Sequence, residues 1–243
     1  HLCDRRQRQM CIRDRVSGGS LKSDKNVIDP EKVAILANQI KALTKQYTIS
    51  LVIGGGNIFR GNVANDLNID RNDADAMGML ATVINGLILM NVFKNHGIKT
   101  KLFSALKMDK IVDEYTTRDV NEALNNDYVC VFVAGVGLPH FTTDTGAALR
   151  AVETKSKFIL MAKNGVDGVY DKDPIKYPDA KRFDNLSYEE IINKSLTVID
   201  QSALTLCWDN NVSIIVFNAN EPNCLIKAMN KEIKTTIINQ GEK

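Results

Sequence analysis

Apolar residues in this chain follow two spacings, one typical of helices and one typical of buried strands. Asp29-Pro30 suits the start of a helix. Five apolar residues then recur every three or four positions: Val33, Leu36, Ile40, Leu43 and Tyr47. The next run, 49–53, is apolar and β-branched and stops at Gly54-Gly55-Gly56. The pattern predicts an amphipathic helix and then a buried strand that ends in a tight loop.

The same alternation continues along the chain. The long apolar stretch 74–93 predicts a buried helix, marked by Leu80, Val83, Ile84 and Leu87. Further strands are predicted at 98–104, 128–134, 157–162, 213–217 and 234–238. Further helices are predicted near 118–125, 143–154, 187–194, 198–210 and 222–230. Ser187 and Glu190 fit a capping box, and Pro222 fits a first helical turn.

Strands separated by helices of this length predict an α/β fold, a three-layer αβα sandwich around a mainly parallel sheet. Ligands of such folds bind beyond the carboxyl ends of the strands, so the loops that come after strands are the places to search. The polar segment Lys172 to Asp184 is short enough to be a surface loop. Residues 16–243 are therefore predicted to form a single domain.

Composition excludes several classes of protein. The 243 residues are 44% hydrophobic, which supports a buried core, and the net charge is +2. Residues 1–15 hold five Arg and two Asp, so the remainder is almost neutral and shows no basic, aromatic surface for nucleic acid. The five cysteines are scattered and fit a reducing cytoplasm. Asp75, Asn85 and Asn91 interrupt the stretch 74–93, which favours a buried helix over a membrane span.

The first fifteen residues, HLCDRRQRQMCIRDR, differ from the rest of the chain. They carry five Arg residues and two of the five cysteines and show no hydrophobic period. MCIRDR resembles a translated sequencing adaptor or a cloning scar, so residues 1–15 are predicted to be non-native. A genuine basic arm is the alternative.

The loop Gly54 to Gly61, GGGNIFRG, is the richest candidate site. Consecutive glycines let backbone N–H groups approach phosphate oxygens, and Arg60 can make a bidentate contact. The loop matches neither a Walker A motif nor G-x-G-x-x-G. It predicts a phosphate cradle, with a simple glycine turn as the alternative.

A second glycine-bearing loop, Gly135 to Asp144, comes directly after the strand at 128–134. Thr142 and Thr143 run into a helix whose positive N-terminal end favours anions. Ordinary N-capping is the alternative for Thr143 and Asp144. His140 is interpreted as a wall of the loop rather than as a base.

A third loop, Asn164 to Pro174, combines an aromatic ring with carboxylates that could hold a purine, although such a composition is often only a turn. Asp200 stands at a predicted helix start, as an N-cap or as a carboxylate that faces a metal. Serine-nucleophile and zinc chemistries lack their motifs. Two anion loops at strand ends predict phosphoryl transfer between two phosphorylated groups.

Several longer motifs carry a more specific resemblance. They are VIGGGNIFRG (52–61), DAMGMLATVINGL (75–87), FTTDTGAALRA (141–151), VDGVYDKDP (166–174) and VFNAN (216–220). In this order and spacing the chain resembles the bacterial uridylate kinases of the amino-acid-kinase superfamily, from about Val16 onward. The resemblance implies the reaction ATP + UMP → ADP + UDP with Mg²⁺, in pyrimidine nucleotide synthesis. It also implies a cytoplasmic homohexamer with GTP and UTP as effectors, and no nucleic-acid or membrane partner.

The resemblance also implies roles for single residues. The residues that it places at UMP are Gly55, Asp75, Val136, Gly137, Leu138, Pro139, His140, Phe141, Thr142 and Thr143. The residues that it places at ATP are Ser17, Gly18, Gly56, Arg60, Asn164, Tyr170 and Asp173. Those near the transferring phosphoryl group are Arg15, Arg60, Asp144 and Asp200. No metal site made of protein ligands alone is implied.

The chain departs from the family pattern at two places. Arg15 stands where the family has a lysine, and the usual apolar first strand before it is expected to be missing. Val136, Leu138 and His140 replace the usual Thr, Asn and aromatic residue of the acceptor loop. Two alternatives therefore stay open: a relative that phosphorylates acetylglutamate or carbamate, and a nucleotide-binding regulatory protein without turnover. The kinase hypothesis requires the loops Gly54 to Arg60 and Gly135 to Thr143 to be neighbours.

Overall fold

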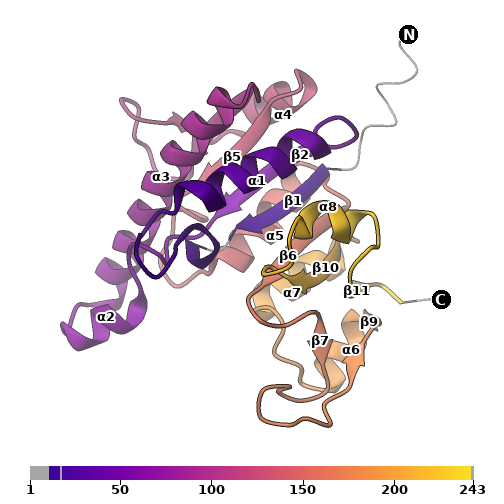
Figure 1. Cartoon of the computed structure of the whole chain (residues 1–243). Coiled ribbons are helices and arrows are strands. Elements are labelled where there is room, and N and C mark those ends of the chain that lie inside the picture. Colours follow the sequence, from indigo (N-terminus) through magenta and orange to yellow (C-terminus); the bar gives the residue numbers. More distant parts are fainter. Residues whose placement is uncertain (1–10, 17, 242–243) are drawn as a thin grey trace.

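The chain folds around one nine-stranded sheet (Figure 1). The structure is a computed structural model that describes residues 18–241 and, for the backbone alone, residues 11–16. The strand order is β4-β3-β5-β2-β1-β6-β10-β11-β9. The strands are β1 Cys11–Val16, β2 Thr48–Ile53, β3 Thr100–Ser104, β4 Asp113–Glu114, β5 Val129–Val133, β6 Phe158–Lys163, β9 Asn185–Ser187, β10 Ser213–Asn218 and β11 Thr235–Asn239. All neighbouring pairs are parallel except β10 and β11.

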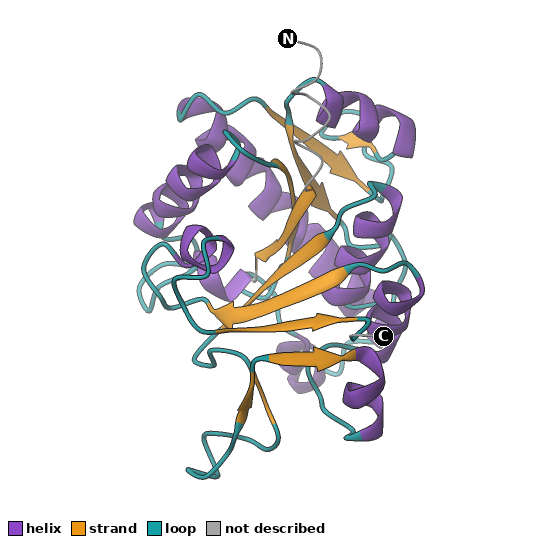
Figure 2. Cartoon of the chain, turned by 90° about the vertical axis from the view of Figure 1, so that its right-hand side faces the viewer, coloured by secondary structure: helices purple, strands orange, loops and turns teal. Residues whose placement is uncertain are grey.

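Helices cover both faces of the sheet (Figure 2). One face carries α1 Pro30–Leu43, α3 Arg71–Asn95 and α8 Cys224–Met229, whose apolar side chains share a core with β2 and β5. The other face carries α4 Thr117–Asn125, α5 Thr143–Glu153, α6 Tyr188–Asn193 and α7 Gln201–Asp209. The predicted three-layer sandwich is thus confirmed.

The predicted helix starts rest on capping groups that the structure contains. Asp29 accepts hydrogen bonds from the N–H groups of Glu31 (3.0 Å) and Lys32 (3.3 Å), with Pro30 in the first turn of α1. Ser187 and Glu190 form the predicted capping box of α6. Pro222, in contrast, precedes α8, whose N-cap is Asn223.

The structure contains a strand at the place where the usual first strand was expected to be missing. Residues 11–16 form β1 in the middle of the sheet, paired with β2 on one side and β6 on the other. Backbone pairing does not depend on which side chains a strand carries, so a segment with an unsuitable pattern can still occupy the gap between two parallel strands. Whether residues 1–15 are native stays a prediction.

Several short elements, among them β4 and β9, were not predicted. The helix α2, Gly61–Asp66, comes directly after the first glycine loop, and the strands β7, Val169–Tyr170, and β8, Arg182–Phe183, pair as a hairpin ahead of β9. These elements are six residues long or shorter, so no period of apolar residues could reveal them. The strand β8 lies within the segment Lys172 to Asp184, which was expected to be a surface loop, and β7 lies just before it, in the third loop.

Among the described residues, α3 is the one helix long and apolar enough to cross a membrane. Its buried residues, which include Val83, Leu89 and Phe93, belong to the core beside β3 and β5. It is therefore placed as a core helix.

Candidate active site

The two glycine loops face one cavity of about 560 Å³ at the carboxyl ends of β2 and β5. The first loop contributes Gly55, Gly56 and Phe59. The second contributes Gly135, Val136, Leu138, Phe141, Thr142 and Thr143, and α3 contributes Arg71 and Asp75. The two loops are therefore neighbours, as the kinase hypothesis requires.

The first loop is closely packed against α3 and against the turn after β1. A Cβ atom on Gly55 would lie 2.6 Å from the carbonyl oxygen of Gly78, and one on Gly18 would lie 2.7 Å from the backbone nitrogen of Gly56. Real Cβ contacts are not this short, so both positions need glycine. The close approach brings Gly18 and Gly56, both expected at ATP, side by side.

Two asparagines fix the first loop from below, a role that the sequence pattern did not lead us to assign. The Asn85 side chain is fully buried and donates to the carbonyl oxygen of Gly54 (2.8 Å) and to Oδ1 of Asn57 (2.7 Å). Nδ2 of Asn57 donates in turn to Oδ1 of Asn85 (3.0 Å). A polar residue inside the apolar stretch 74–93 is the signal in the sequence that could have revealed this role.

Arg60 lies at the end of this loop, on the N-cap position of α2. Its Nε donates to the carbonyl oxygen of Gly56 (2.6 Å), which folds the exposed guanidinium back over the glycines. Its two terminal nitrogens have no partner among the residues that the structure describes. They can therefore take an anion, which agrees with the predicted bidentate contact.

The second loop ends at the N-terminus of α5. Oγ1 of Thr142 accepts the N–H groups of Asp144 (3.1 Å) and Thr145 (3.3 Å) and donates to a carboxylate oxygen of Asp200. Thr142 is thus the N-cap, and its hydroxyl is fully used. The Thr143 hydroxyl lines the cavity and has no partner in the described part of the chain. Of the two predicted oxyanion ligands, Thr143 is the one with a free donor.

Asp200 joins two helices. It caps α7 by accepting the N–H of Ala203 (2.8 Å), and it accepts the hydroxyls of Thr142 and Thr145 at the start of α5. The N-cap interpretation of Asp200 is therefore correct, and its charge also faces the second loop. Asp144 is buried in the first turn of α5.

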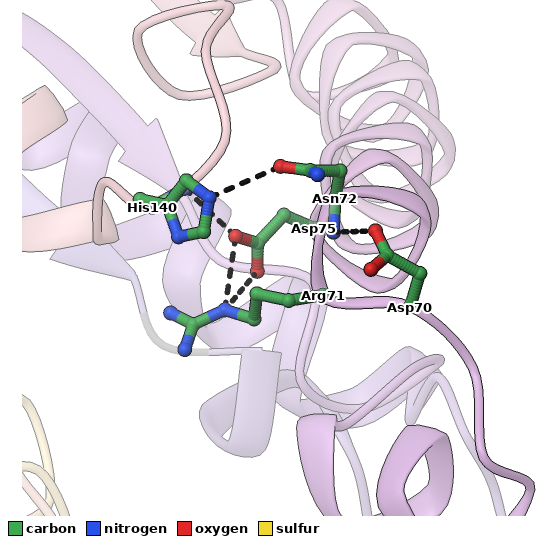
Figure 3. Close-up of polar contacts among 5 residues, drawn as sticks. All are labelled: Asp70, Arg71, Asn72, Asp75 and His140. Atoms are coloured by element: carbon green, nitrogen blue, oxygen red, sulfur yellow. Dashed lines mark hydrogen bonds and ion pairs between the residues drawn. The ribbon is translucent and has the colours of Figure 1, made fainter.

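A polar cluster closes the second loop over the start of α3 (Figure 3). Asp75 accepts the backbone N–H of His140 (2.7 Å) and Nε of Arg71 (3.1 Å), and the His140 imidazole lies 3.0 Å from Oδ1 of Asn72. Burial alone would raise the pKa of Asp75, but these two donors stabilise the carboxylate more, so the pKa lies below its ordinary value. His140 is thus held by two residues of α3, and its role as a wall of the loop stays a prediction.

The residues expected at ATP are not all brought together. Asn164, at the end of β6, lines a second cavity of about 400 Å³ with Gly19 and Gln39. Tyr170 and Asp173 line neither cavity. The Tyr170 hydroxyl donates to Asp167 (2.5 Å), which raises the pKa of Tyr170, and Asp173 accepts the N–H of Ile175 (3.0 Å).

Some predicted residues lie outside these cavities or outside the description. Of the residues expected at UMP, Gly137, Pro139 and His140 do not line the first cavity. Arg60, Asp144 and Asp200 line neither cavity. Ser17 falls outside the described residues, and Arg15 is described only as part of the β1 backbone.

Comparison with known proteins shows which family this chain resembles. The model of the amino acid kinase family matches residues 16–218. A uridylate kinase of Ureaplasma parvum is 45% identical over 93% of this chain and 97% of its own length, and one of Malacoplasma penetrans is 43% identical over 94% and 72%. Crystal structures of UMP kinases from Ureaplasma parvum and Bacillus anthracis superpose with TM-scores of 0.93 and 0.90, at 45% and 33% identity. They cover 96% of this chain and 99% and 97% of their own chains.

Proposed function

The chain belongs to the amino acid kinase family, and we propose from that premise that its two glycine loops carry the phosphorylation of UMP by ATP. The chain is a UMP kinase, a phosphotransferase with a phosphate group as acceptor. The observation that carries this function is the single cavity lined by both loops. Acetylglutamate and carbamate kinases are not among the names that the close relatives carry.

The cavity of about 560 Å³ is the acceptor site. Its polar wall is the N-terminal end of α5, where the helix dipole and the Thr143 hydroxyl attract the UMP phosphate. Its apolar wall is formed by Val136, Leu138 and Phe141, which suit a nucleoside. Asp75 lies on the third side, where a carboxylate can accept hydroxyl groups of the ribose.

The donor ATP lies on the side of Gly18 and Gly56, and Arg60 bridges the two nucleotides. The terminal nitrogens of Arg60 can hold oxygens of both phosphates, because its Nε is already anchored on Gly56. Asn164 contributes from the end of β6. Tyr170 and Asp173 are assigned to ATP only by the resemblance to the family, and they would have to approach by movement of the β7–β8 hairpin.

ATP arrives with Mg²⁺, which neutralises charge on its phosphates. Among the described residues no three His, Cys, Asp or Glu side chains gather to hold a metal by themselves. An ion that enters with ATP would be bound mainly by nucleotide oxygens and water, with at most one or two protein carboxylates. Asp144 and Asp200, beside the start of α5, are the carboxylates proposed for that position.

The chain's own residues position the two nucleotides and neutralise the charge of their phosphates. No general base is needed. The bond between the γ-phosphorus and the bridging oxygen of ATP breaks, and ADP leaves with the electron pair. The bond that forms joins this phosphorus to an oxygen of UMP, which is already ionised at neutral pH. Arg60 and Arg15 stabilise the charge that spreads over the transferring group.

The cellular setting is proposed from the same family. We propose a cytoplasmic enzyme of pyrimidine nucleotide synthesis that assembles as a homohexamer and responds to GTP and UTP. Self-association is supported by α3, which exposes Met77, Leu80 and Ile84 along one face. Light scattering on the purified protein measures the assembly.

Residues 1–15 are proposed to be non-native. The strand β1 carries Arg13, Asp14 and Arg15 in the centre of the sheet, whereas its neighbours β2 and β6 read TISLVI and FILMAK. Central parallel strands are covered on both faces and are normally apolar throughout. Replacing residues 10–15 by an apolar strand that ends in lysine is expected to raise both the melting temperature and UDP production. A variant with neither gain would show that Arg15 and this strand suffice.

The proposed function is tested by ADP release with UMP, N-acetylglutamate or carbamate as acceptor. Of the three acceptors, we expect only UMP to support turnover, with UDP as product. Thr143→Val should raise the KM for UMP about tenfold, because one hydrogen bond to a charged phosphate is lost. Thr205→Val is the matched control, because the Thr205 hydroxyl on α7 only bonds its own helix. UMP binding without UDP formation would instead indicate a regulatory protein.

A further inference from the structure

Three side chains beneath the second loop form a polar cluster that the proposed mechanism does not use: Arg150 is buried, and Tyr115 and Glu153 beside it are partly exposed. Arg150 of α5 is only 5% exposed, and its guanidinium carbon lies 3.6 Å from the centre of the Tyr115 ring. Its Nη1 lies 2.8 Å from Oε2 of Glu153, and the Tyr115 hydroxyl donates to the same oxygen (2.6 Å). The guanidinium is therefore held on one face by stacking and on one edge by an ion pair.

Stability alone is a poor reason for this arrangement. Burying a guanidinium costs hydration, and an apolar group of the same volume often stabilises a core as well or better. Nε of Arg150 is buried without a hydrogen-bond partner in the described part of the chain, so the cost is not fully offset. Burial and the Glu153 carboxylate raise the pKa of Tyr115, which keeps its hydroxyl a donor at neutral pH.

The remaining edge of the guanidinium faces the start of the second loop. Nη2 of Arg150 donates to the carbonyl oxygen of Gly135 (3.4 Å). Backbone φ angles here are +61° at Ala134, +55° at Gly135 and +79° at Gly137, a conformation that neighbouring contacts must hold in place. Gly146, one turn before Arg150 on the same face of α5, also packs against Gly135, because a Cβ on Gly146 would lie in ordinary contact, 3.6 Å from the Cα atom of Gly135.

The orientation of this one carbonyl fixes a donor in the cavity. In a trans peptide the C=O and the next residue's N–H point in opposite directions, and the described residues contain no cis peptide. With the Gly135 carbonyl turned toward Arg150, the N–H of Val136 points away from it. Gly135 and Val136 both line the acceptor cavity, and this N–H has no acceptor among the described residues.

We propose that Arg150, braced by Tyr115 and Glu153, is a positioning residue that aims the Val136 N–H at an oxygen of the acceptor nucleotide. The inference rests on the proposed function, because it assumes that the acceptor occupies this cavity. Arg150 would then act on the acceptor only through the peptide group between Gly135 and Val136, without touching either substrate.

The test compares Arg150→Met, Arg150→Lys and Tyr115→Phe with the wild-type protein. We expect Arg150→Met to raise the KM for UMP about tenfold, the loss that corresponds to one hydrogen bond, with the KM for ATP unchanged. Arg150→Lys should not restore the wild-type KM, because a point ammonium cannot stack and bond along two edges. Tyr115→Phe removes only the brace and should raise the KM for UMP less.

Thr154→Val is the matched control. The Thr154 hydroxyl donates to the backbone oxygen of Arg150 (2.7 Å), so its loss weakens the end of α5 without touching the loop. It should lower the melting temperature and leave the KM for UMP unchanged. The inference would be overturned if the KM for UMP stayed unchanged in both single variants, Tyr115→Phe and Arg150→Met. It would also be overturned if the KM values for UMP and for ATP rose equally. If Arg150→Met does not fold, Tyr115→Phe decides. A wild-type protein that neither binds nor phosphorylates UMP would instead refute the proposed function.

Discussion

The two glycine loops that share the cavity are held in opposite ways. The loop 54–61 rests on buried packing: Gly55 fits against α3, and Asn85 supports the backbone from below. The loop 135–143 is held by polar contacts at its ends and carries Leu138, 59% exposed, and Phe141, 50% exposed. The first loop is thus formed before any ligand arrives, whereas the second still has apolar surface for a ligand to cover.

This difference suits the two tasks of a phosphotransferase. Charge must be placed before the reaction begins, so the phosphate cradle gains from a fixed backbone. The acceptor must be recognised and enclosed, and in the proposed function a bound nucleoside would gain binding energy by covering Leu138 and Phe141. We therefore expect variants of the first loop to change turnover or folding, and variants of the second to change the KM for UMP.

The largest expected effect lies in the first loop. Arg60→Ala should lower kcat about 10³-fold, because a positioned arginine contributes on that order to phosphoryl transfer. Stopped-time UDP assays at saturating UMP and ATP measure it. Arg118→Ala, in the exposed part of α4, is the control and should keep wild-type kcat. Unchanged kinetics in Arg60→Ala would remove this residue from the mechanism.

The buried amide beneath the first loop should affect folding more than binding. Asn85→Ala leaves the Gly54 carbonyl and Oδ1 of Asn57 without the Asn85 amide and should lower the free energy of unfolding by about 2 kcal/mol. Urea unfolding measures the change. Asn91→Ala, on the exposed side of the same helix, should stay within about 0.5 kcal/mol of wild type. Equal losses in the two variants would contradict the packing assigned to this loop.

The smallest expected effect concerns the polar contacts of the second loop. The lowered pKa of Asp75 means that its carboxylate stabilises the fold above the unfolded value of about 4 and loses this contribution as the pH falls through the folded value. The melting temperatures of wild type and Asp75→Asn should therefore differ by a constant amount from about pH 5 to 8 and converge below about pH 4. The difference should be small and salt-sensitive, because solvent reaches Asp75 and Arg71. If the difference in melting temperature varied between about pH 5 and 8, the group responsible would not be the Asp75 carboxylate.

The sequence predicted those elements whose ends carry their own signals. Asp29-Pro30 begins α1 and the glycine run ends β2, so local chemistry decided both boundaries. The pairing of Asn57 with Asn85 could not be predicted, because the two are 28 positions apart and only the folded chain brings them together. The same holds for Arg150 and Gly135.

The site was predicted in the same uneven way. Motifs after strands located both glycine loops, since the carboxyl ends of parallel strands share one edge. They did not reveal that the Thr142 hydroxyl is consumed by capping and by Asp200, because that depends on where α7 begins.

The reciprocal pair beneath the first loop also limits how this protein can change over evolutionary time. A substitution at Asn57 leaves the fully buried Asn85 without one of its partners, and a substitution at Asn85 leaves the partly buried Asn57 with only the carbonyl oxygen of Val27 among the described residues. A single-step path between two viable sequences is then closed at both sites, and descendants can leave this state only by altering both together. Correlated substitution at these two positions among homologous genes would be the record of that constraint.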